Sequence, residues 1–507
     1  MALAYHARNM RKTVLALTAL APLTAHAGGV FVGEAGTQAM ERGGAYVAKA
    51  DDPTALSINP AGLAKLGKAQ IYLGANLLNY NLSYKRSGLY PSQGRGPSDP
   101  SYVGTEYPTV ENEASFQPIP YLAGGGTIGN LALAVGLYAP PGVPNRDFPC
   151  TAGDEFCRVD ETGAPAPQRY DVVDQEAMVV YPSLAAAYRL HERVDIGARF
   201  SWGIASVKAR NFPWSNRNTA EDPLREGDFS ADVTDSFIPT FGAGVLIRPA
   251  DFLEFGAAYS YKTQVRGKGT GNARLGPEVL PGVQTQLVPK PDAMTECATG
   301  GTTSALKTCV DFDMPQTFAA GLRFIMRDHA GGERADVEFD MKWENWADAS
   351  DDAITVDGQD MYSGLPLKTV INKHGFEDVL AFRVGGAYRI DVAKNDLTLR
   401  AGVAYDTAAA PASWTRVDKD GRARTTFAAG AAYSLDRWRF DVGVALVTEG
   451  MQEVSNVSLA NTNVDNRVQP DPLQPSLPED RTNYYPINAG RYDSGYFVGL
   501  VGVTAMF

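Results

Sequence analysis

Apolar and polar residues alternate strictly along many short segments of this chain. Residues 194–202 place Val194, Ile196 and Phe200 on one face and Asp195 and Arg199 on the other. The same alternation returns at 253–257, 335–343, 397–401 and 440–444. A period of two residues is typical of a β-strand with one apolar and one polar face. The pattern therefore predicts an all-β protein.

A second kind of segment, rich in small apolar residues, lies beside these alternating ones, at 182–188, 239–245, 315–324 and 427–433. Short turns join the two kinds at 191–193, 249–251 and 435–436, and long polar loops follow on the other side. Soluble sandwiches also alternate, but short turns at one end and long loops at the other are the asymmetry of transmembrane β-barrels. We therefore expect a transmembrane antiparallel β-barrel rather than two or three soluble domains.

The alternation predicts about fourteen strands, an even number as in single-chain bacterial barrels. They are expected at 68–84, 117–126, 130–139, 174–190, 193–209, 234–248, 252–266, 314–327, 333–345, 376–390, 395–408, 424–434, 437–449 and 490–507. With an even number, the first and last strands can pair, so that no strand edge is left unsatisfied in lipid.

Both ends of the chain agree with export to an outer membrane. Arg11 and Lys12 precede an apolar stretch at 14–23, and 25–27 offers small residues for signal cleavage, so we expect a signal peptide at 1–27. Phe507 is an aromatic residue that ends the last alternating strand. No later stretch has the roughly 18 consecutive apolar residues of a membrane helix. The sequence predicts a multi-pass protein of a Gram-negative outer membrane.

Residues 28–67 do not alternate and have no place in the strand count. This segment contains Ala50-Asp51-Asp52-Pro53 and Asn59-Pro60-Ala61-Gly62-Leu63. These motifs, the later Gly136-Leu137-Tyr138-Ala139-Pro140, the terminal Phe507 and about fourteen strands together resemble the FadL/TodX family of outer-membrane transporters for long-chain fatty acids and other hydrophobic compounds.

The resemblance implies an N-terminal hatch at 28–67 that plugs the lumen of a barrel at 68–507. It also implies loops that capture ligand, a lumenal binding site and a kinked third strand that opens the wall sideways. Gly136 and Pro140 would supply that kink, because proline lacks the ladder donor and glycine weakens a strand. Prolines at strand ends are also common without a kink.

The hatch offers one specific candidate, the turn at Asn59, Pro60 and Ala61. Asparagine tolerates tight backbone geometry and bonds locally, and proline fixes the next dihedral. This turn would lock the hatch against the wall and couple it to the lateral gate. The alternative is a plain turn that leads into the first strand.

The ligand-binding candidates come from one loop and from the lumenal face. Phe212 and Trp214 lie among polar neighbours, and an exposed aromatic cluster can mark a ligand groove. Loop packing or an aromatic belt at the membrane interface is the alternative. Arg199, Arg383 and Arg400 point into the lumen, where arginine offers a bidentate fork to a carboxylate. Neutralisation by lumenal Asp and Glu residues is the competing explanation.

Four cysteines fall in segments that we expect to be external loops, and export permits disulfides. Four cysteines allow three pairings, and pairing within each loop, Cys150 with Cys157 and Cys297 with Cys309, is the economical one. Zinc is the alternative, but neither pair has Cys-x-x-Cys spacing or a nearby His, so no metal is expected.

Charge and motif content exclude other classes. A net charge of -12 argues against nucleic acid as a partner. The sequence Gly124-Gly-Gly126-Thr-Ile-Gly129 matches a dinucleotide fingerprint only formally, because no crossover helix follows it, so no cofactor is expected. No Gly-x-Ser-x-Gly occurs and no His has a Ser beside it, so we do not expect an enzyme.

These observations predict passive, hatch-gated transport of long-chain fatty acids or similar hydrophobic molecules, with loop capture, lumenal binding and lateral release into outer-membrane lipid by a monomer. The rival is a general porin for small polar solutes, which would share the barrel but would have no reason for a Gly-rich hatch of roughly 40 residues. Fatty acid and aromatic hydrocarbon substrates stay open alternatives.

Overall fold

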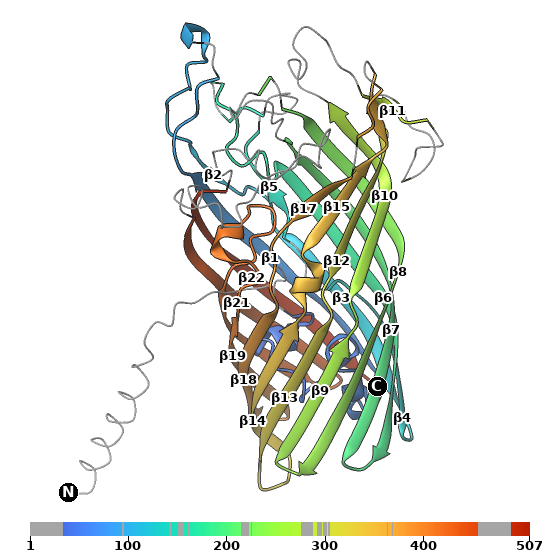
Figure 1. The fold of residues 1–507 in the computed structure, drawn as a ribbon. Helices are drawn as coiled ribbons and strands as arrows, with labels where there is room; N and C mark the ends of the chain where they lie inside the picture. Colours follow the sequence, from blue (N-terminus) through green and yellow to red (C-terminus); the bar gives the residue numbers. More distant parts are fainter. Residues whose placement is uncertain are drawn as a thin grey trace, which may run out of the picture.

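The computed structural model is a tilted, closed β-barrel with a small helical segment inside its lower half (Figure 1). It describes residues 34–93, 96–140, 144–150, 157–159, 163–213, 223–224, 226–274, 287–291, 297, 302, 305–361, 364–367, 369–454 and 488–507. The expected signal peptide, the first residues of the expected hatch and Trp214 lie outside these ranges.

The strands and helical turns have the following bounds. The strands are β1 (Gln70–Arg86), β2 (Thr109–Glu111), β3 (Gln117–Ile128), β4 (Leu131–Tyr138), β5 (Arg146–Asp147), β6 (Asp174–His191), β7 (Val194–Asn211), β8 (Asp228–Ala250), β9 (Leu253–Ser260), β10 (Thr263–Arg274), β11 (Leu287–Pro289), β12 (Leu306–Met314), β13 (Thr317–Arg327), β14 (Glu333–Glu344), β15 (Asp351–Val356), β16 (Gly358–Asp360), β17 (Val370–Lys373), β18 (Val379–Val392), β19 (Asn395–Asp406), β20 (Arg424–Leu435), β21 (Trp438–Val454) and β22 (Gly490–Met506). The helical turns are α2 (Thr37–Glu41), α3 (Ala55–Ile58), η1 (Pro60–Lys65), η2 (Gly96–Ser98), η4 (Trp346–Ala349) and η5 (Ala412–Trp414).

The barrel closes by pairing its first and last strands. β1 and β22 are antiparallel over their full length, from Gln70 opposite Met506 to Arg86 opposite Gly490. The wall has fourteen strands when β9/β10, β12/β13, β14/β15 and β17/β18 are each counted as one interrupted strand. The prediction of about fourteen antiparallel strands is confirmed. Complete pairing around the wall satisfies the backbone groups that face lipid.

Several strands extend further toward the long-loop end than the alternation predicted. β8 begins at Asp228 rather than 234, and β10 continues to Arg274. The alternation also missed β12 before residue 314. In these upper segments the outer face is polar, as the exposed Gln264, Arg266 and Lys268 show. No lipid surrounds these upper segments, so their outer face need not be apolar. The alternation of apolar and polar residues that predicts a strand is therefore lost there.

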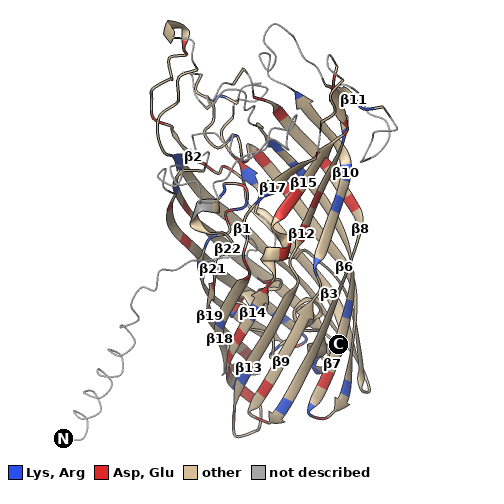
Figure 2. Ribbon diagram, in the orientation of Figure 1, with Lys and Arg blue, Asp and Glu red and all other residues tan. Residues whose placement is uncertain are grey.

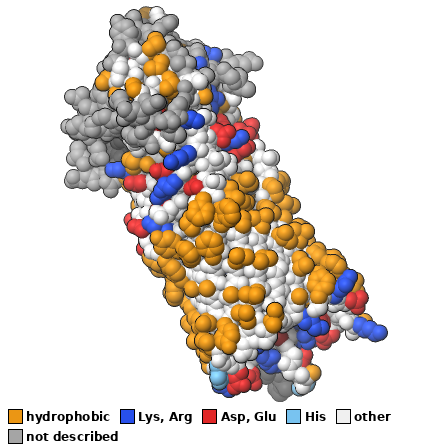
Figure 3. Space-filling view, turned by 90° about the vertical axis from the view of Figure 1, so that its right-hand side faces the viewer, with side chains coloured by type: hydrophobic (Ala, Val, Ile, Leu, Met, Phe, Trp, Pro, Cys, Tyr) orange, Lys and Arg blue, Asp and Glu red, His pale blue; other side chains and the backbone are white. Residues whose placement is uncertain are grey.

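The outer wall carries a broad apolar band, and charged residues lie above and below it (Figure 3). Its exposed side chains come from strands all around the barrel, among them Leu73, Leu122, Val135, Leu184, Phe200, Phe241, Phe324, Phe382, Leu399, Val442 and Val501. Within the described residues, no helix has both the length and the apolar character of a membrane span. The apolar band matches the hydrocarbon layer in which such a barrel is solvated.

The segment before β1, which we call the hatch and which is described from Glu34 to Gly67, folds into the lower lumen. It consists of α2, α3, η1 and the turns between them, and nearly all its residues are buried. Charged residues gather around it at the lower end of the barrel and again along the upper ends of β8 and β10 (Figure 2). The hatch therefore sits in a polar lumen whose outside is apolar.

Candidate functional site

The turn at Asn59 joins the hatch to the barrel wall. The Asn59 amide is fully buried, and its Nδ2 donates to Val47 O at 2.8 Å and to Val245 O of β8 at 3.3 Å. Its Oδ1 accepts from Ala61 N at 3.2 Å, and Pro60 takes the first position of η1. The side chain thus caps η1, forms a hydrogen bond within the hatch and forms another to the wall, while coupling of this turn to a lateral gate stays a prediction.

A ring of wall glycines leaves room for the backbone and side chains of the hatch. A Cβ atom at Gly244 would collide with Asn59 Oδ1, and one at Gly197 would collide with Pro60. At Gly443 a Cβ would lie 2.7 Å from Glu41 Cγ. The members of this ring that face the hatch are Gly197, Gly244, Gly256, Gly321, Gly385, Gly402, Gly430 and Gly443. Sequence reasoning missed the ring, although its signal was present as one lumen-facing glycine in the middle of most strands.

Two carboxylates of β14 hold the hatch by its backbone. Asp340 Oδ2 accepts from Tyr46 N at 2.8 Å and from Val47 N at 3.0 Å. Glu338 Oε1 accepts from Ala48 N at 2.6 Å. Consecutive backbone N–H groups therefore converge on one wall strand.

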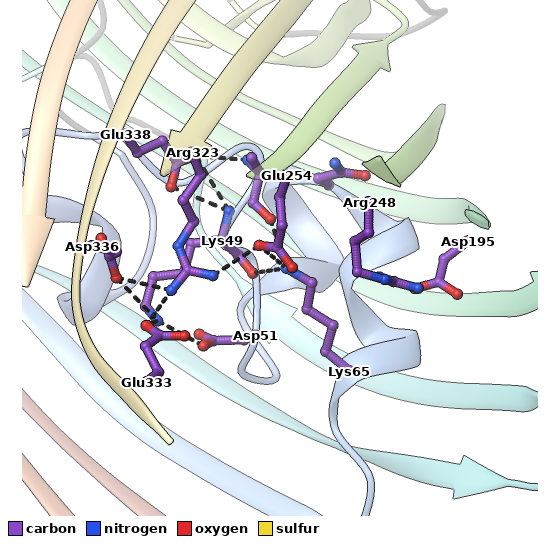
Figure 4. Close-up of polar contacts among 12 residues, drawn as sticks. Lys49, Asp51, Lys65, Asp195, Arg248, Glu254, Arg323, Glu333, Asp336 and Glu338 are labelled. Atoms are coloured by element: carbon purple, nitrogen blue, oxygen red, sulfur yellow. Dashed lines mark hydrogen bonds and ion pairs between the residues drawn. The ribbon is translucent and has the colours of Figure 1, made fainter. Parts of the chain in front are cut away.

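Buried ion pairs surround this attachment. Arg42 of the hatch is fully buried and pairs with Asp336 at 2.7 Å and Glu338 at 3.3 Å. In Figure 4, lysines of the hatch and an arginine of β13 interleave with wall carboxylates. These ion pairs join Lys49 to Asp51, Glu333 and Asp336, Lys65 to Glu254, and Arg323 to Glu254, Glu333 and Asp336. Removing one partner of such a network leaves a buried charge uncompensated.

The three predicted ligand arginines all contact the hatch. Arg400 donates to Glu41 Oε2 at 2.6 Å and to Asp441 Oδ1 at 2.7 Å. Arg383 pairs with Glu34. Carboxylates of the protein thus neutralise Arg400 and Arg383, which agrees with the alternative that lumenal Asp and Glu residues pair with these arginines.

Arg199 is different, because its bonds go to neutral acceptors. Its Nη1 donates to Ser57 O at 2.7 Å and its Nη2 to Ser260 Oγ at 3.3 Å, and the guanidinium is buried. Among the described residues, no acidic side chain forms an ion pair with it. Binding of a ligand carboxylate by any of these arginines stays a prediction.

Burial and charge act differently on two hatch carboxyls. Burial opposes ionisation of Glu34, but Lys342 and Arg383 outweigh it and lower its pKa to about 2. At Glu41 burial is the larger effect and raises the pKa to about 7, although Arg400 opposes it. Glu41 therefore titrates near neutral pH, whereas Glu34 stays ionised.

A largely apolar cavity lies in the upper lumen. It has an empty volume of about 1290 Å³ including its open mouth, and its apolar lining includes Val172, Val179, Val207, Ala231, Phe312 and Met314. Polar groups enter it at Asp352, Asp418 and Lys419. Pockets of this size and character accept small apolar or amphiphilic molecules.

The cavity passes through the barrel wall between β3 and β6. Its lining includes the consecutive residues Met178, Val179 and Val180 and the consecutive residues 118–120. Neighbouring residues of a strand point to opposite faces. A cavity lined by both faces therefore lies in the plane of the wall.

The wall opens there because β4 ends early. β4 pairs with β6 only up to Tyr138 opposite Tyr181, so the upper part of β6 loses this neighbour. Pro118 and Pro120 on β3 have no N–H to continue the ladder. Pro140 lines the cavity, whereas Gly136 lies in the regular part of β4, opposite Ala123 and Ser183. The opening therefore begins after Tyr138, the last residue of β4, and not at Gly136 within the strand.

The predicted aromatic candidate Phe212 does not line this cavity, although Arg210 and Asn211 before it do. It is buried in a loop cluster with Cys157, Ala166 and Val173, and the Arg210 guanidinium lies 5.2 Å from its ring. Trp214 is not among the described residues. A role for either residue in ligand binding stays a prediction.

The cysteines pair as predicted, Cys150 with Cys157 and Cys297 with Cys309. The expectation that all four lie in loops is wrong for Cys309, which belongs to β12. The strand rises above the lipid at that point, where alternation no longer marks it. The second disulfide therefore ties a loop directly to the wall.

Comparison with known proteins gives one family and one short curated match. The profile of the family described as "Outer membrane protein transport protein (OMPP1/FadL/TodX)" matches residues 18–472. The "Putative outer membrane protein NMB0088" of Neisseria meningitidis serogroup B is 31% identical over 135 residues. That match covers 26% of this chain and 27% of the relative, so the chain spans about a quarter of that relative's length.

Solved structures share the fold at low sequence identity. A FadL homologue of Pseudomonas aeruginosa has a TM-score of 0.68 and 16% identity, covering 95% of this chain and 100% of its own. The toluene transporter TodX of Pseudomonas putida has a TM-score of 0.61 and 16% identity, covering 94% and 100%. The toluene transporter TbuX of Ralstonia pickettii has a TM-score of 0.59 and 14% identity, covering 93% and 98%.

Proposed function

We propose that this chain, which belongs to the OMPP1/FadL/TodX family of outer membrane transport proteins, carries hydrophobic small molecules passively into the outer membrane. Its family, described as that of an outer membrane protein transport protein, and its closed barrel support this proposal. Long-chain fatty acids or similar molecules are captured by the loops, bound in the lumenal cavity and released sideways into lipid by a monomer.

The opening between β3 and β6 is the observation that carries this proposal. It connects an apolar cavity with the outer surface at Met178, which is 60% exposed. The neighbouring strands carry the exposed Trp202 and Phe237, whose rings lie 6.1 Å apart. Aromatic residues of this kind mark a membrane interface. The opening therefore leads toward the boundary of the hydrocarbon layer.

The energetics of an apolar ligand favour such a route. Each buried CH₂ group contributes about 0.8 kcal/mol, so an alkyl chain prefers the cavity and the bilayer to water. A path that keeps the ligand between apolar surfaces needs no energy source when the concentration gradient is favourable. Rearrangement of the hatch, the remaining step of the proposal, would clear the lower lumen.

A general porin is the second candidate, and the hatch argues against it. Backbone bonds to Glu338 and Asp340 and ion pairs of Arg42 hold this segment inside the lumen. A water-filled porin needs an open lumen for polar solutes. The hatch therefore favours the transporter over the porin.

Mass spectrometry of extracted small molecules tests the proposal. The protein is purified in a detergent unlike any lipid, beside the variant Asn59→Ala with Pro60→Ala. Stoichiometric long-chain acids or hydrocarbons in the wild type support the transporter and identify its ligand. A clean lumen together with strong, unsaturable ion conductance supports the porin.

A further inference from the structure

The connection between β19 and β20 lies inside the barrel instead of outside it. We call residues 407–423 the strap. It joins two strands at the long-loop end, where connections usually face water, yet Ala409, Thr415 and Val417 are at most 1% exposed. The charged Arg416, Asp420 and Arg422 are also buried. A buried polar loop needs many partners, and the partners of the strap fall into two groups.

The first group anchors the strap on the β1 side of the lumen. Val417 N donates to Asp171 Oδ2 at 3.0 Å, and Val417 O accepts from Arg146 Nε at 3.0 Å. Asp420 Oδ2 accepts from Tyr80 OH of β1 at 2.9 Å. Arg422 Nη1 also donates to Gly450 O at 2.9 Å and Asn488 Nδ2 to Thr415 O at 3.3 Å. Backbone and side-chain bonds together fix this side firmly.

The second group lies across the lumen, where Ala409 O accepts from Glu377 N at 2.6 Å near the start of the strap, whereas residues 418 and 419 make their contacts through side chains. Lys419 Nζ lies 2.6 Å from Asp352 Oδ2 of β15 and 5.2 Å from the centre of the Phe312 ring of β12. Asp418 Oδ2 lies 3.8 Å from His374 Nε2. Both partners of the Lys419–Asp352 pair are slightly exposed, at 15% and 14% of their side chains. The side-chain contacts of residues 418 and 419 form a latch that can open without disturbing the backbone bonds at Ala409 and Val417.

The strap, and not the hatch, borders the ligand cavity. Asp418 and Lys419 are part of the cavity lining together with Asp352 and Phe312, and none of the described hatch residues lines it. A molecule in the cavity therefore touches the Lys419–Asp352 pair directly. Separation of this pair would widen the cavity on the side that faces the rest of the upper lumen.

We propose that the strap is the movable wall of the cavity and that Lys419 and Asp352 form its latch. Opening of the latch admits a ligand from the loops, and closure holds the ligand facing the opening between β3 and β6. Lys419 and Asp352 are positioning residues in this scheme. The inference rests on the proposed function and adds an entry gate that is separate from the exit through the wall.

A reversible tether across the latch tests the proposal. Asp352→Cys and Lys419→Cys are introduced together and joined by a short bis-methanethiosulfonate, in full-length protein in nanodiscs. The readout is the fluorescence of N-phenyl-1-naphthylamine as it enters the protein and, after preloading, as it leaves for lipid. The tether is expected to slow entry at least about tenfold, a change that corresponds to about 1.4 kcal/mol. Exit is expected at the untethered rate.

The matched control places the same tether across Lys85 and Glu106, an exposed pair at 2.9 Å outside the cavity. This tether is expected to leave entry unchanged. Equal entry rates with and without the tether at 352 and 419 overturn the strap proposal while leaving the transporter intact. Failure of untethered protein to take up the probe overturns the proposed function itself.

A substitution gives the opposite signal and needs no tether. Lys419→Met keeps the length of the side chain and removes the ion pair, so entry is expected to speed up about two- to fivefold, the range that a partly exposed pair supports. Lys419→Asp with Asp352→Lys restores a pair of reversed polarity and is expected to return entry toward the wild-type rate. Unchanged entry in Lys419→Met contradicts the latch.

Discussion

The side chain of Asn59 lies against Gly244 so closely that a Cβ atom on residue 244 would collide with Asn59 Oδ1. The asparagine belongs to the hatch and the glycine to wall strand β8. This relationship repeats around the barrel, where wall glycines provide the space that the hatch backbone occupies. Docking of the hatch thus depends on the absence of side chains at these wall glycines as much as on the hydrogen bonds of side chains such as that of Asn59.

Gly244→Ala is therefore expected to loosen the hatch. Overpacking a well-filled interior costs about 1–3 kcal/mol, and here the hatch turn is the part that must give way. Hydrogen exchange of residues 44–66 measures the effect, and faster exchange is expected there with the barrel strands unchanged.

Gly499→Ala is the matched control. A Cβ at this lipid-side glycine of β22 would lie 3.8 Å from Leu77 Cβ, an ordinary contact. It is expected to leave hatch exchange at the wild-type rate. Equal exchange in Gly244→Ala and Gly499→Ala would show that the glycine ring does not position the hatch.

Asn59→Ala should weaken the same attachment from the hatch side. It leaves Ala61 N and the carbonyls of Val47 and Val245 without the Asn59 bonds, and each lost bond to a buried group costs about 1–3 kcal/mol. Limited proteolysis in nanodiscs is expected to cut the hatch faster than in wild type. Asn112→Ala, which removes bonds of an outer loop, serves as control, and equal cutting in both variants would contradict a special role for Asn59.

Hatch docking is expected to weaken as pH rises through neutrality. Burial raises the pKa of Glu41 to about 7, above its ordinary value of 4.5. Because the pKa is raised in the docked state, protonated Glu41 stabilises docking fully below about pH 4.5. This stabilisation, up to about 3 kcal/mol, is lost as the pH rises through about 7. Ion conductance in planar bilayers, measured from acidic to alkaline pH, should rise at the alkaline end.

Glu41→Gln separates this titration from others. A glutamine side chain does not titrate in this pH range, so the ion conductance of the Glu41→Gln protein should stay low throughout it. A rise of conductance in Glu41→Gln equal to that of wild type would assign the effect to another group.

The Cys297–Cys309 disulfide is expected to stabilise the loop that it closes. Its partners are 12 residues apart, and closing a loop of about this length contributes roughly 3 kcal/mol in the chain-entropy account. Cys297→Ser with Cys309→Ser should increase protease cutting between 297 and 305 and leave the barrel strands intact. Cys150→Ser with Cys157→Ser provides a comparison, because that pair lies in another loop.

The sequence predicted the wall well because lipid imposes a strict rule on it. A strand with hydrocarbon outside and a polar lumen inside must alternate, and β22 was expected at 490–507 and runs over Gly490–Met506. Above the lipid the rule lapses, which explains the missed starts of β8 and β12. The turn at Asn59 and Pro60 could be predicted because its chemistry is local, whereas its role in gating stays a prediction.

The rest of the site depends on contacts between distant residues. The wall opening requires Pro118 and Pro120 of β3 to face β6 beyond the end of β4, and no local pattern places them there. The strap has the composition of an exposed polar loop, and only its partners, such as Tyr80 and Asp352, explain its burial. Sequence alone therefore predicted the fold but not the geometry of the candidate site.

The most direct test of the account closes the opening between β3 and β6. Ile119→Trp with Met178→Trp fills the gap with rings on both strands, and the measurement is transfer of preloaded N-phenyl-1-naphthylamine into the surrounding nanodisc lipid. If release is lateral, the probe still binds to this variant but reaches lipid at least about tenfold more slowly, a barrier increase of about 1.4 kcal/mol. Transfer at the wild-type rate in this variant would contradict lateral release.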